Sequence, residues 1–131
     1  MLECLIVGDS IAVGTSNVKM ECESYAKSGI NSSNWNKKYK DVNLKSEVVI
    51  ISLGSNDYKG IDTEKEIKLL RNKVKASRVY WILPAIKPHV QDIVKKVAEE
   101  NGDIILPITR LQKDGIHPSW AGYKELAEKA K

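Results

Sequence analysis

The sequence predicts an α/β fold in which a parallel sheet lies between two layers of helices, and three observations support this. Four short apolar runs end at Gly or Pro without polar alternation, as is typical of strands buried on both faces. Segments of helical periodicity separate these runs, which favours a doubly wound sheet. The chain has 131 residues, of which 42% are hydrophobic, enough for one core. We therefore expect one domain over residues 1–131, a three-layer α/β/α sandwich with a flavodoxin-like, five-stranded parallel sheet.

The expected elements alternate along the chain. Strands are expected at residues 4–7, 21–26, 48–53, 79–83 and 103–106. The segment 21–26 is the most polar of these and should be an edge strand. Helices are expected at residues 11–17 and 33–40, from Thr63 to Val74, from Pro88 to a stop at Gly102, and from near Pro118 to Ala130. Thr63 and Glu66 have the spacing of a capping box, and Pro88 suits a first helical turn.

The charge pattern excludes some classes of protein. The net charge is +4, and no apolar run approaches the roughly 20 residues of a membrane span. The densest basic group is Lys37, Lys38 and Lys40, flanked by Trp35 and Tyr39. A nucleic-acid interface usually has more Arg and a denser basic stripe, so we expect a solvated helix face and no nucleic-acid partner.

The N-terminal residues and the two cysteines bear on the compartment. Glu3 stands where a signal peptide would have its basic start, and the apolar run that follows has only four residues. We therefore expect no signal peptide and a protein that is either cytoplasmic or delivered by a route that the sequence does not show. Cys4 and Cys22 are expected to be two buried thiols that pack as small hydrophobic side chains. A disulfide is not expected, because small secreted domains usually have more than one.

The loop after the first strand contains a candidate nucleophile. Between Gly8 and Gly14 the spacing fits neither a phosphate loop, nor a dinucleotide fingerprint, nor a Gly-x-Ser-x-Gly elbow. What remains is Ser10 at a strand-to-helix turn. It is either an N-cap or a reactive serine.

A candidate base lies near the C-terminus. Asp114 precedes His117 by three residues, with Gly115 between them. A carboxylate so close can fix the tautomer of the ring and leave its other nitrogen free to take a proton. The second histidine, His89, should be a surface residue. With two separated histidines and no His/Cys cluster, no metal site is expected.

Two further loops contain candidate oxyanion donors. Asn56 follows the strand 48–53 and has a side-chain amide that could stabilise a developing negative charge. Gly29 follows the strand 21–26 and could bring a backbone N–H close to a ligand. Each is also an ordinary turn residue.

Taken together, the four loops resemble the SGNH hydrolases, also called GDSL-type esterases and lipases, over the whole chain. Residues 8–10 (Gly-Asp-Ser), 54–57 (Gly-Ser-Asn-Asp) and 114–118 (Asp-Gly-Ile-His-Pro) are similar to three blocks of the family, and Gly29 falls in the second block. The resemblance implies that Ser10 is the nucleophile, with His117 and Asp114 completing a triad. It implies an oxyanion hole from the N–H of Ser10, the N–H of Gly29 and the side chain of Asn56.

The resemblance leaves some points open. Lys27 and Ser28 stand where family members often carry Asn or Arg, so the N–H of Ser28 or Ile30 is an alternative donor. The implied function is hydrolysis of short-chain acyl esters, with an O-acetylated carbohydrate as one candidate substrate and no cofactor. Thioesters remain open. Compact family members of this kind also suggest a phage-associated enzyme.

Two alternative functions remain open. A non-catalytic module that binds a glycan or another ligand could use the same loops, and a flavodoxin-like cofactor binder would leave Asp114 and His117 unexplained. Trp81 and Trp120 could wall the substrate site or belong to the core. The sequence does not predict the oligomeric state.

Overall fold

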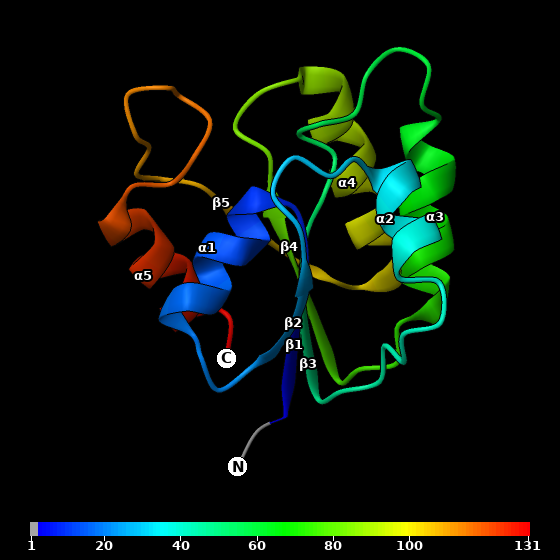
Figure 1. The fold of residues 1–131 in the computed structure, drawn as a ribbon, viewed down its shortest axis with the longest axis horizontal. Coiled ribbons are helices and arrows are strands. Elements are labelled where there is room, and N and C mark those ends of the chain that lie inside the picture. The colour runs from blue at the N-terminus through cyan, green and yellow to red at the C-terminus, as the bar shows by residue number, and fades with distance from the viewer. Residues whose placement is uncertain (1–2) are drawn as a thin grey trace.

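The computed structural model describes residues 3–131, and it confirms the α/β class (Figure 1). Five strands alternate with five helices in the chain. The strands are β1 (Cys4–Gly8), β2 (Glu23–Ala26), β3 (Val48–Ser52), β4 (Arg78–Leu83) and β5 (Ile104–Pro107). The helices are α1 (Ser10–Val18), α2 (Ser32–Lys38), α3 (Thr63–Lys73), α4 (Pro88–Asn101) and α5 (Trp120–Lys129).

The sheet is parallel throughout, in the order β2-β1-β3-β4-β5. The chain moves from β1 to one edge and then returns to add β3 on the other side. This reversal falls at the carboxyl ends of β1 and β3, which is the usual ligand position in such sheets. The loops after all five strands reach this end of the sheet.

Helices cover both faces of the sheet, and each face has its own core. Figure 1 shows α1 and α5 on one side and α2, α3 and α4 on the other. Ile11 and Leu126 pack with Ile6 and Ile50 in the first core. The larger core on the second face includes Trp35. All five residues of β3 are buried, as its uninterrupted apolar sequence predicts.

The cysteines correct one expectation, because Cys4 and Cys22 form a disulfide with a Cα–Cα distance of 4.7 Å. The parallel register explains the pairing. Leu5 lies opposite Glu23, so the residues just before them face each other. The bridge ties the start of β1 to the exposed edge strand β2.

Two helix starts differ slightly from the sequence interpretation. Asp62, not Thr63, caps α3, because its carboxylate accepts from the N–H of Lys65. The helix expected near Pro118 begins at Trp120, and Ser119 caps it by accepting from the N–H of Gly122. In both cases a side chain with a better placed oxygen lies next to the expected residue.

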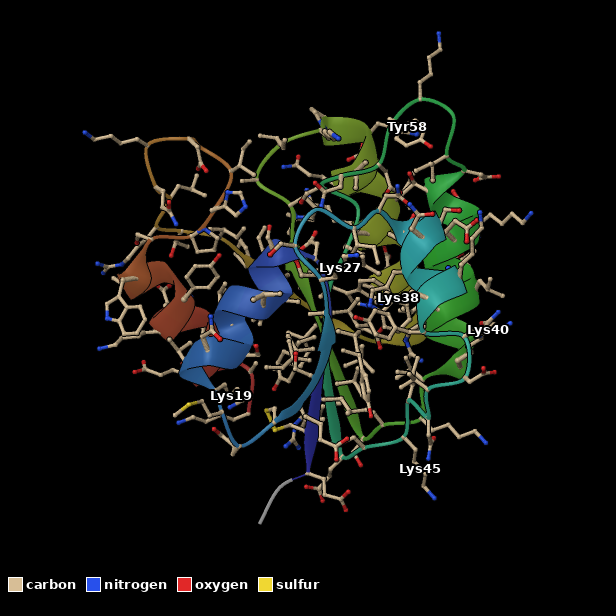
Figure 2. The ribbon with its side chains drawn as sticks, in the orientation of Figure 1. Lys19, Lys27, Lys38, Lys40, Lys45 and Tyr58 are labelled. Atoms are coloured by element: carbon tan, nitrogen blue, oxygen red, sulfur yellow. A yellow bond between two sulfur atoms is a disulfide. The ribbon has the colours of Figure 1, made fainter. Side chains whose placement is uncertain are left out.

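The basic group lies at the end of α2 and in the turn that follows it. Lys37, Lys38 and Lys40 are exposed, and Figure 2 labels Lys38 and Lys40 on that side of the molecule. Trp35 is 1% exposed, and its indole N–H donates to the carbonyl of Tyr25. This indole therefore presents no face on which a base could stack. No helix within residues 3–131 has the length and apolar character to cross a bilayer.

Candidate active site

Ser10 is the first residue of α1 and lies directly after a tight turn from β1. The turn needs Gly8, which has φ 140° and whose added Cβ would lie 1.8 Å from the carbonyl oxygen of Ser52. The N–H of Asp9 donates to that same oxygen at 2.9 Å. The nucleophile predicted from the sequence is thus placed at the switch between β1 and β3, at the amino end of a helix.

Asp9 braces this turn from inside the protein. Its Oδ1 accepts from the N–H of Ile11 at 3.0 Å and from the hydroxyl of Ser52 at 3.1 Å, while its Oδ2 is buried without a partner among the described residues. Burial is the largest influence and raises the pKa of Asp9 to about 6. Asp9 therefore caps α1 and positions Ser10, and its side chain is fully buried.

His117 lies in a loop that closes on itself before α5. The N–H of Gln112 donates to the carbonyl of His117 at 2.8 Å, and the Gln112 amide donates to the carbonyl of Pro118 at 2.9 Å. Leu111 also forms an isolated bridge with Pro118. Gln112 had no distinguishing pattern in the sequence, because its role depends on the path of the whole loop.

Ser10, His117 and Asp114 form a continuous hydrogen-bonded chain. The Oγ of Ser10 lies 2.8 Å from Nε2 of His117. The Nδ1 of His117 lies 2.7 Å from Oδ2 of Asp114. The serine comes from the first loop and the other two residues from the last, 107 positions away for Ser10 and His117, so only the fold brings them together.

The carboxylate of Asp114 determines the tautomer of His117. Backbone hydrogen bonds from Ile116 and His117, followed by the hydrogen bond from the His117 ring, lower the pKa of Asp114 to about 2. An ionised carboxylate can only accept, so Nδ1 carries the proton. Nε2 then has its lone pair toward the Ser10 hydroxyl, which is the arrangement a general base needs.

The loop after β2 presents Gly29 at the same end of the sheet. Gly29 is exposed, with φ 81°, and a Cβ there would meet nothing within 4 Å. The N–H of Lys27 donates to the carbonyl of Gly8 at 3.0 Å, which docks this loop on the end of β1. Figure 2 labels Lys27 at the start of the loop.

Free backbone donors remain at this position. The N–H groups of Ser10 and Gly29 have no partner within residues 3–131, whereas the N–H of Ile30 donates to the carbonyl of Lys27. Of the donors considered from the sequence, the N–H of Ile30 is therefore already occupied, whereas the N–H groups of Ser10, Ser28 and Gly29 have no hydrogen-bond partner within residues 3–131.

Asn56 lies beside this loop. Its Nδ2 donates to the carbonyl of Ile30 at 3.1 Å. An amide nitrogen has two hydrogens, so this bond orients the side chain and leaves one donor. No hydrogen bond joins Ser10 directly to Gly29 or Asn56 in the described chain. The loop 27–30 instead bonds to Gly8 at the end of β1 and to the side chain of Asn56.

Asp57 links the loops through contacts that the sequence did not indicate. Its carboxylate accepts from the N–H and hydroxyl of Ser32 at 2.8 and 2.6 Å, and from the hydroxyl of Thr63 at 2.8 Å. These bonds join the loop after β3 to the start of α2 and the start of α3.

The remaining candidates divide between core and surface. Trp81 is fully buried and its indole N–H donates to Asp103 at 2.8 Å, so it does not wall the site. Trp120 is 65% exposed, with the ammonium of Lys124 lying 5.3 Å from its ring centroid. His89 is exposed, as expected. Across residues 3–131 no group of three or more His, Cys, Asp or Glu side chains is placed to hold a metal ion.

The parallel five-stranded sheet with helices on both faces defines an α/β fold, and known structures share it. The chain is similar to a Bacteroides fragilis protein provisionally designated an acylhydrolase, with 21% identity, a TM-score of 0.68, and coverage of 96% of this chain and 83% of that one. It is also similar to a Parabacteroides merdae protein provisionally designated a GDSL-like lipase, with 17% identity, a TM-score of 0.70, and coverage of 97% and 92%.

A third similar structure is the C-terminal catalytic domain of peptidoglycan O-acetyltransferase A from Streptococcus pneumoniae, which carries a methylsulfonyl adduct. It is 18% identical with a TM-score of 0.55, and the match covers 96% of this chain and 88% of that domain. A scan against protein-family models gives no match, and a search of curated proteins finds no relative. The chain thus has the fold of the SGNH/GDSL proteins.

Proposed function

We propose that this protein is a serine esterase that hydrolyses short-chain acyl esters, with O-acetylated carbohydrate as its candidate substrate. The observation that carries the proposal is the hydrogen-bonded chain from Ser10 through His117 to Asp114, at 2.8 and 2.7 Å. A serine hydroxyl on a neutral imidazole, itself held by a carboxylate, is the constellation for acyl transfer on several unrelated folds.

In the first half of the reaction, the Oγ of Ser10 attacks the ester carbonyl carbon while Nε2 of His117 takes the hydroxyl proton. The oxyanion of the tetrahedral intermediate accepts hydrogen bonds from the N–H of Ser10, the N–H of Gly29 and Nδ2 of Asn56. The amino end of α1 also favours negative charge there. Collapse of the intermediate breaks the ester bond, and His117 gives the proton to the leaving alcohol.

In the second half, water attacks the acyl group on Ser10 and His117 takes the water proton. The second intermediate collapses to a carboxylic acid, and the proton returns to Ser10. Asp114 remains ionised throughout and stabilises the charged imidazolium. These steps need no cofactor or metal ion.

The openness of the triad supports a small acyl group on a bulky alcohol. The side chains of His117 and Asp114 are 34% and 42% exposed, so an acyl chain finds little apolar cover there. An acetyl group needs little cover, and a sugar ring can extend into solvent. The similar Streptococcus pneumoniae domain is an O-acetyltransferase of peptidoglycan, which makes acetyl chemistry on glycans a reasonable first assay.

The test is hydrolysis of p-nitrophenyl acetate and butyrate by wild type, Ser10→Ala and the control Ser16→Ala. Ser16 lies on the same helix, and its hydroxyl donates only to the carbonyl of Val13. Methanesulfonyl fluoride labelling followed by peptide mass spectrometry reports on the nucleophile independently. Acetylated xylan and acetylated peptidoglycan then test the alcohol.

We expect turnover and labelling in wild type and Ser16→Ala, both lost in Ser10→Ala, and faster cleavage of acetate than of butyrate. Without the nucleophile, only the small rate enhancement from the oxyanion hole and from substrate binding remains. Equal rates in wild type and Ser10→Ala, together with no label on Ser10, would refute the proposal. They would favour the alternative of a non-catalytic module that binds a glycan or another ligand.

A further inference from the structure

Lys87, at the start of α4, has a backbone conformation that its side chain type does not favour. Its φ and ψ are 64° and 79°, and it is the one non-glycine residue in the described part of the chain with positive φ. This conformation is costly for a residue with a Cβ. Such cost persists only where the surrounding structure compensates for it, and this often occurs near functional sites.

The side chain of Lys87 does not cap the helix, although the Lys87 carbonyl accepts the first helical hydrogen bond from the N–H of Gln91 at 3.0 Å. Lys87 occupies the N-cap position of α4 but makes no side-chain cap hydrogen bond. A lysine has no acceptor with which to cap N–H groups, and Ser, Thr, Asp or Asn are the usual residues there. Helix stability alone therefore gives no reason for a lysine at this position.

The side chain of Lys87 instead contacts the loop that carries Asn56. Its ammonium donates to the carbonyl oxygen of Asp57 at 2.7 Å, a short hydrogen bond of the charge-assisted kind. No other group within residues 3–131 donates to this oxygen. Lys87 thus joins the loop after β4 to the loop after β3, which lie at the same end of the sheet (Figure 1).

Asn56 is held from two sides as a result. On one side its own Nδ2 is bound to the carbonyl of Ile30. On the other side the peptide of Asp57, the next residue, is bound by its carbonyl to Lys87 and by its N–H to Gly54. Tyr58, the residue after Asp57, is 67% exposed and is labelled on this loop in Figure 2. Within residues 3–131, the bond from Lys87 is the one hydrogen bond from the start of α4 to the main chain of this loop.

We propose that Lys87 is a positioning residue for Asn56, which holds the Asn56 amide at the oxyanion position through the peptide of Asp57. This inference rests on the proposed esterase function. A displacement of about 1 Å at a reacting group can cost on the order of 100-fold in rate. This role explains the unfavourable positive φ of Lys87, because that conformation directs the ammonium group toward the carbonyl of Asp57.

The kinetic test uses p-nitrophenyl acetate with wild type, Lys87→Met, Asn56→Ala and the double variant. Lys59→Met is the matched control, since Lys59 is exposed on the same loop as Asn56 and its side chain has no partner in the described chain. We expect Lys87→Met to lower kcat about 10- to 100-fold with KM within about two-fold. In the Asn56→Ala background the same change should alter kcat less than about two-fold, because no amide remains to be positioned.

A further variant separates positioning from folding. Lys87→Gly removes the ammonium but adopts positive φ freely, so its Tm should equal or exceed that of wild type while kcat falls as in Lys87→Met. A Lys87→Met kcat within two-fold of wild type, or an equal loss with and without Asn56, would overturn the inference. So would a kcat loss confined to variants whose Tm also falls.

A readout independent of activity distinguishes failure of this inference from failure of the proposed function. The ¹⁵N side-chain amide signals of Asn56 are assigned by their absence in Asn56→Ala. In Lys87→Met they should shift or broaden, and in Lys59→Met they should not. Unchanged signals would refute the role of Lys87 even in an active enzyme. If the signals change but the protein has no esterase activity, the positioning role of Lys87 stands and the proposed esterase function is refuted.

Discussion

Removal of the disulfide between Cys4 and Cys22 should destabilise the protein by an amount that the loop length determines. The bridge closes a loop with a sequence separation of 18. The chain-entropy relation gives about 3 kcal/mol for a loop of this length. With an unfolding entropy of about 2.1 cal/mol/K per residue, a chain of 131 residues should lose roughly 10 °C in Tm.

The structure provides a second reason to expect a measurable effect. In β2 the residues Glu23 and Ser24 are exposed and the remaining two are only partly buried. This strand pairs with β1 alone, at the edge of the sheet, so few apolar contacts replace a missing bridge. The strand leads to the loop that carries Gly29, and loosening it should also lower the rate of ester hydrolysis.

The assay is thermal unfolding, followed by circular dichroism, of wild type and of the Cys4→Ala/Cys22→Ala variant, each with and without reductant. Wild type should lose Tm on reduction, and the variant should not respond. Two titratable thiols in denatured protein that was never reduced would show that the bridge is absent. A variant Tm within about 2 °C of wild type would refute the magnitude.

Three other predictions concern burial and packing. Because burial raises the pKa of Asp9 to about 6 from 3.8, the folded protein keeps a proton that the unfolded chain loses between these values. The stability that Asp9 contributes should therefore fall by about 3 kcal/mol as the pH rises from about 4 to 6. The difference in urea unfolding free energy between wild type and Asp9→Asn should show this pH dependence. Gly8→Ala places a Cβ 1.8 Å from the carbonyl oxygen of Ser52, so it should cost at least about 3 kcal/mol; a Tm close to wild type would contradict this. Asp103 is 3% exposed and binds Arg71 through two hydrogen bonds of 2.7 and 2.9 Å. Asp103→Ala should cost about 3–5 kcal/mol because it leaves a largely buried guanidinium unpaired, whereas a loss below 1 kcal/mol in urea would show that solvent compensates.

The strands and the site motifs could be predicted from the sequence because both are local. Residues 48–51 of β3 and 79–83 of β4 are runs of consecutive apolar residues. Such runs indicate burial on both faces of a sheet. The spacing of Asp114 and His117 likewise places carboxylate and ring within reach through a turn of four residues. Even the polar character of 21–26 correctly indicated the edge strand.

The errors and omissions involve residues that only meet through the sheet. The disulfide depends on the register of β1 against β2, which no pattern in either segment encodes. The cap of α3 depends on whether Thr63 is free, and in the structure its hydroxyl is already bound to Asp57. Lys87 has no local feature that predicts positive φ or a contact 30 residues away.

By itself the sequence determined the α/β class, the edge strand, and Ser10, His117, Asp114 and Asn56 as the chemical groups of the candidate site. Tertiary structure decided which of them touch, that the cysteines pair, and that Asp9, Asp57 and Lys87 brace the loops between them. The physical reason is the distance along the sequence over which each effect acts. Periodicity and turn chemistry act over a few residues, whereas strand order and register bring together groups that the chain separates widely, and no short window contains both partners.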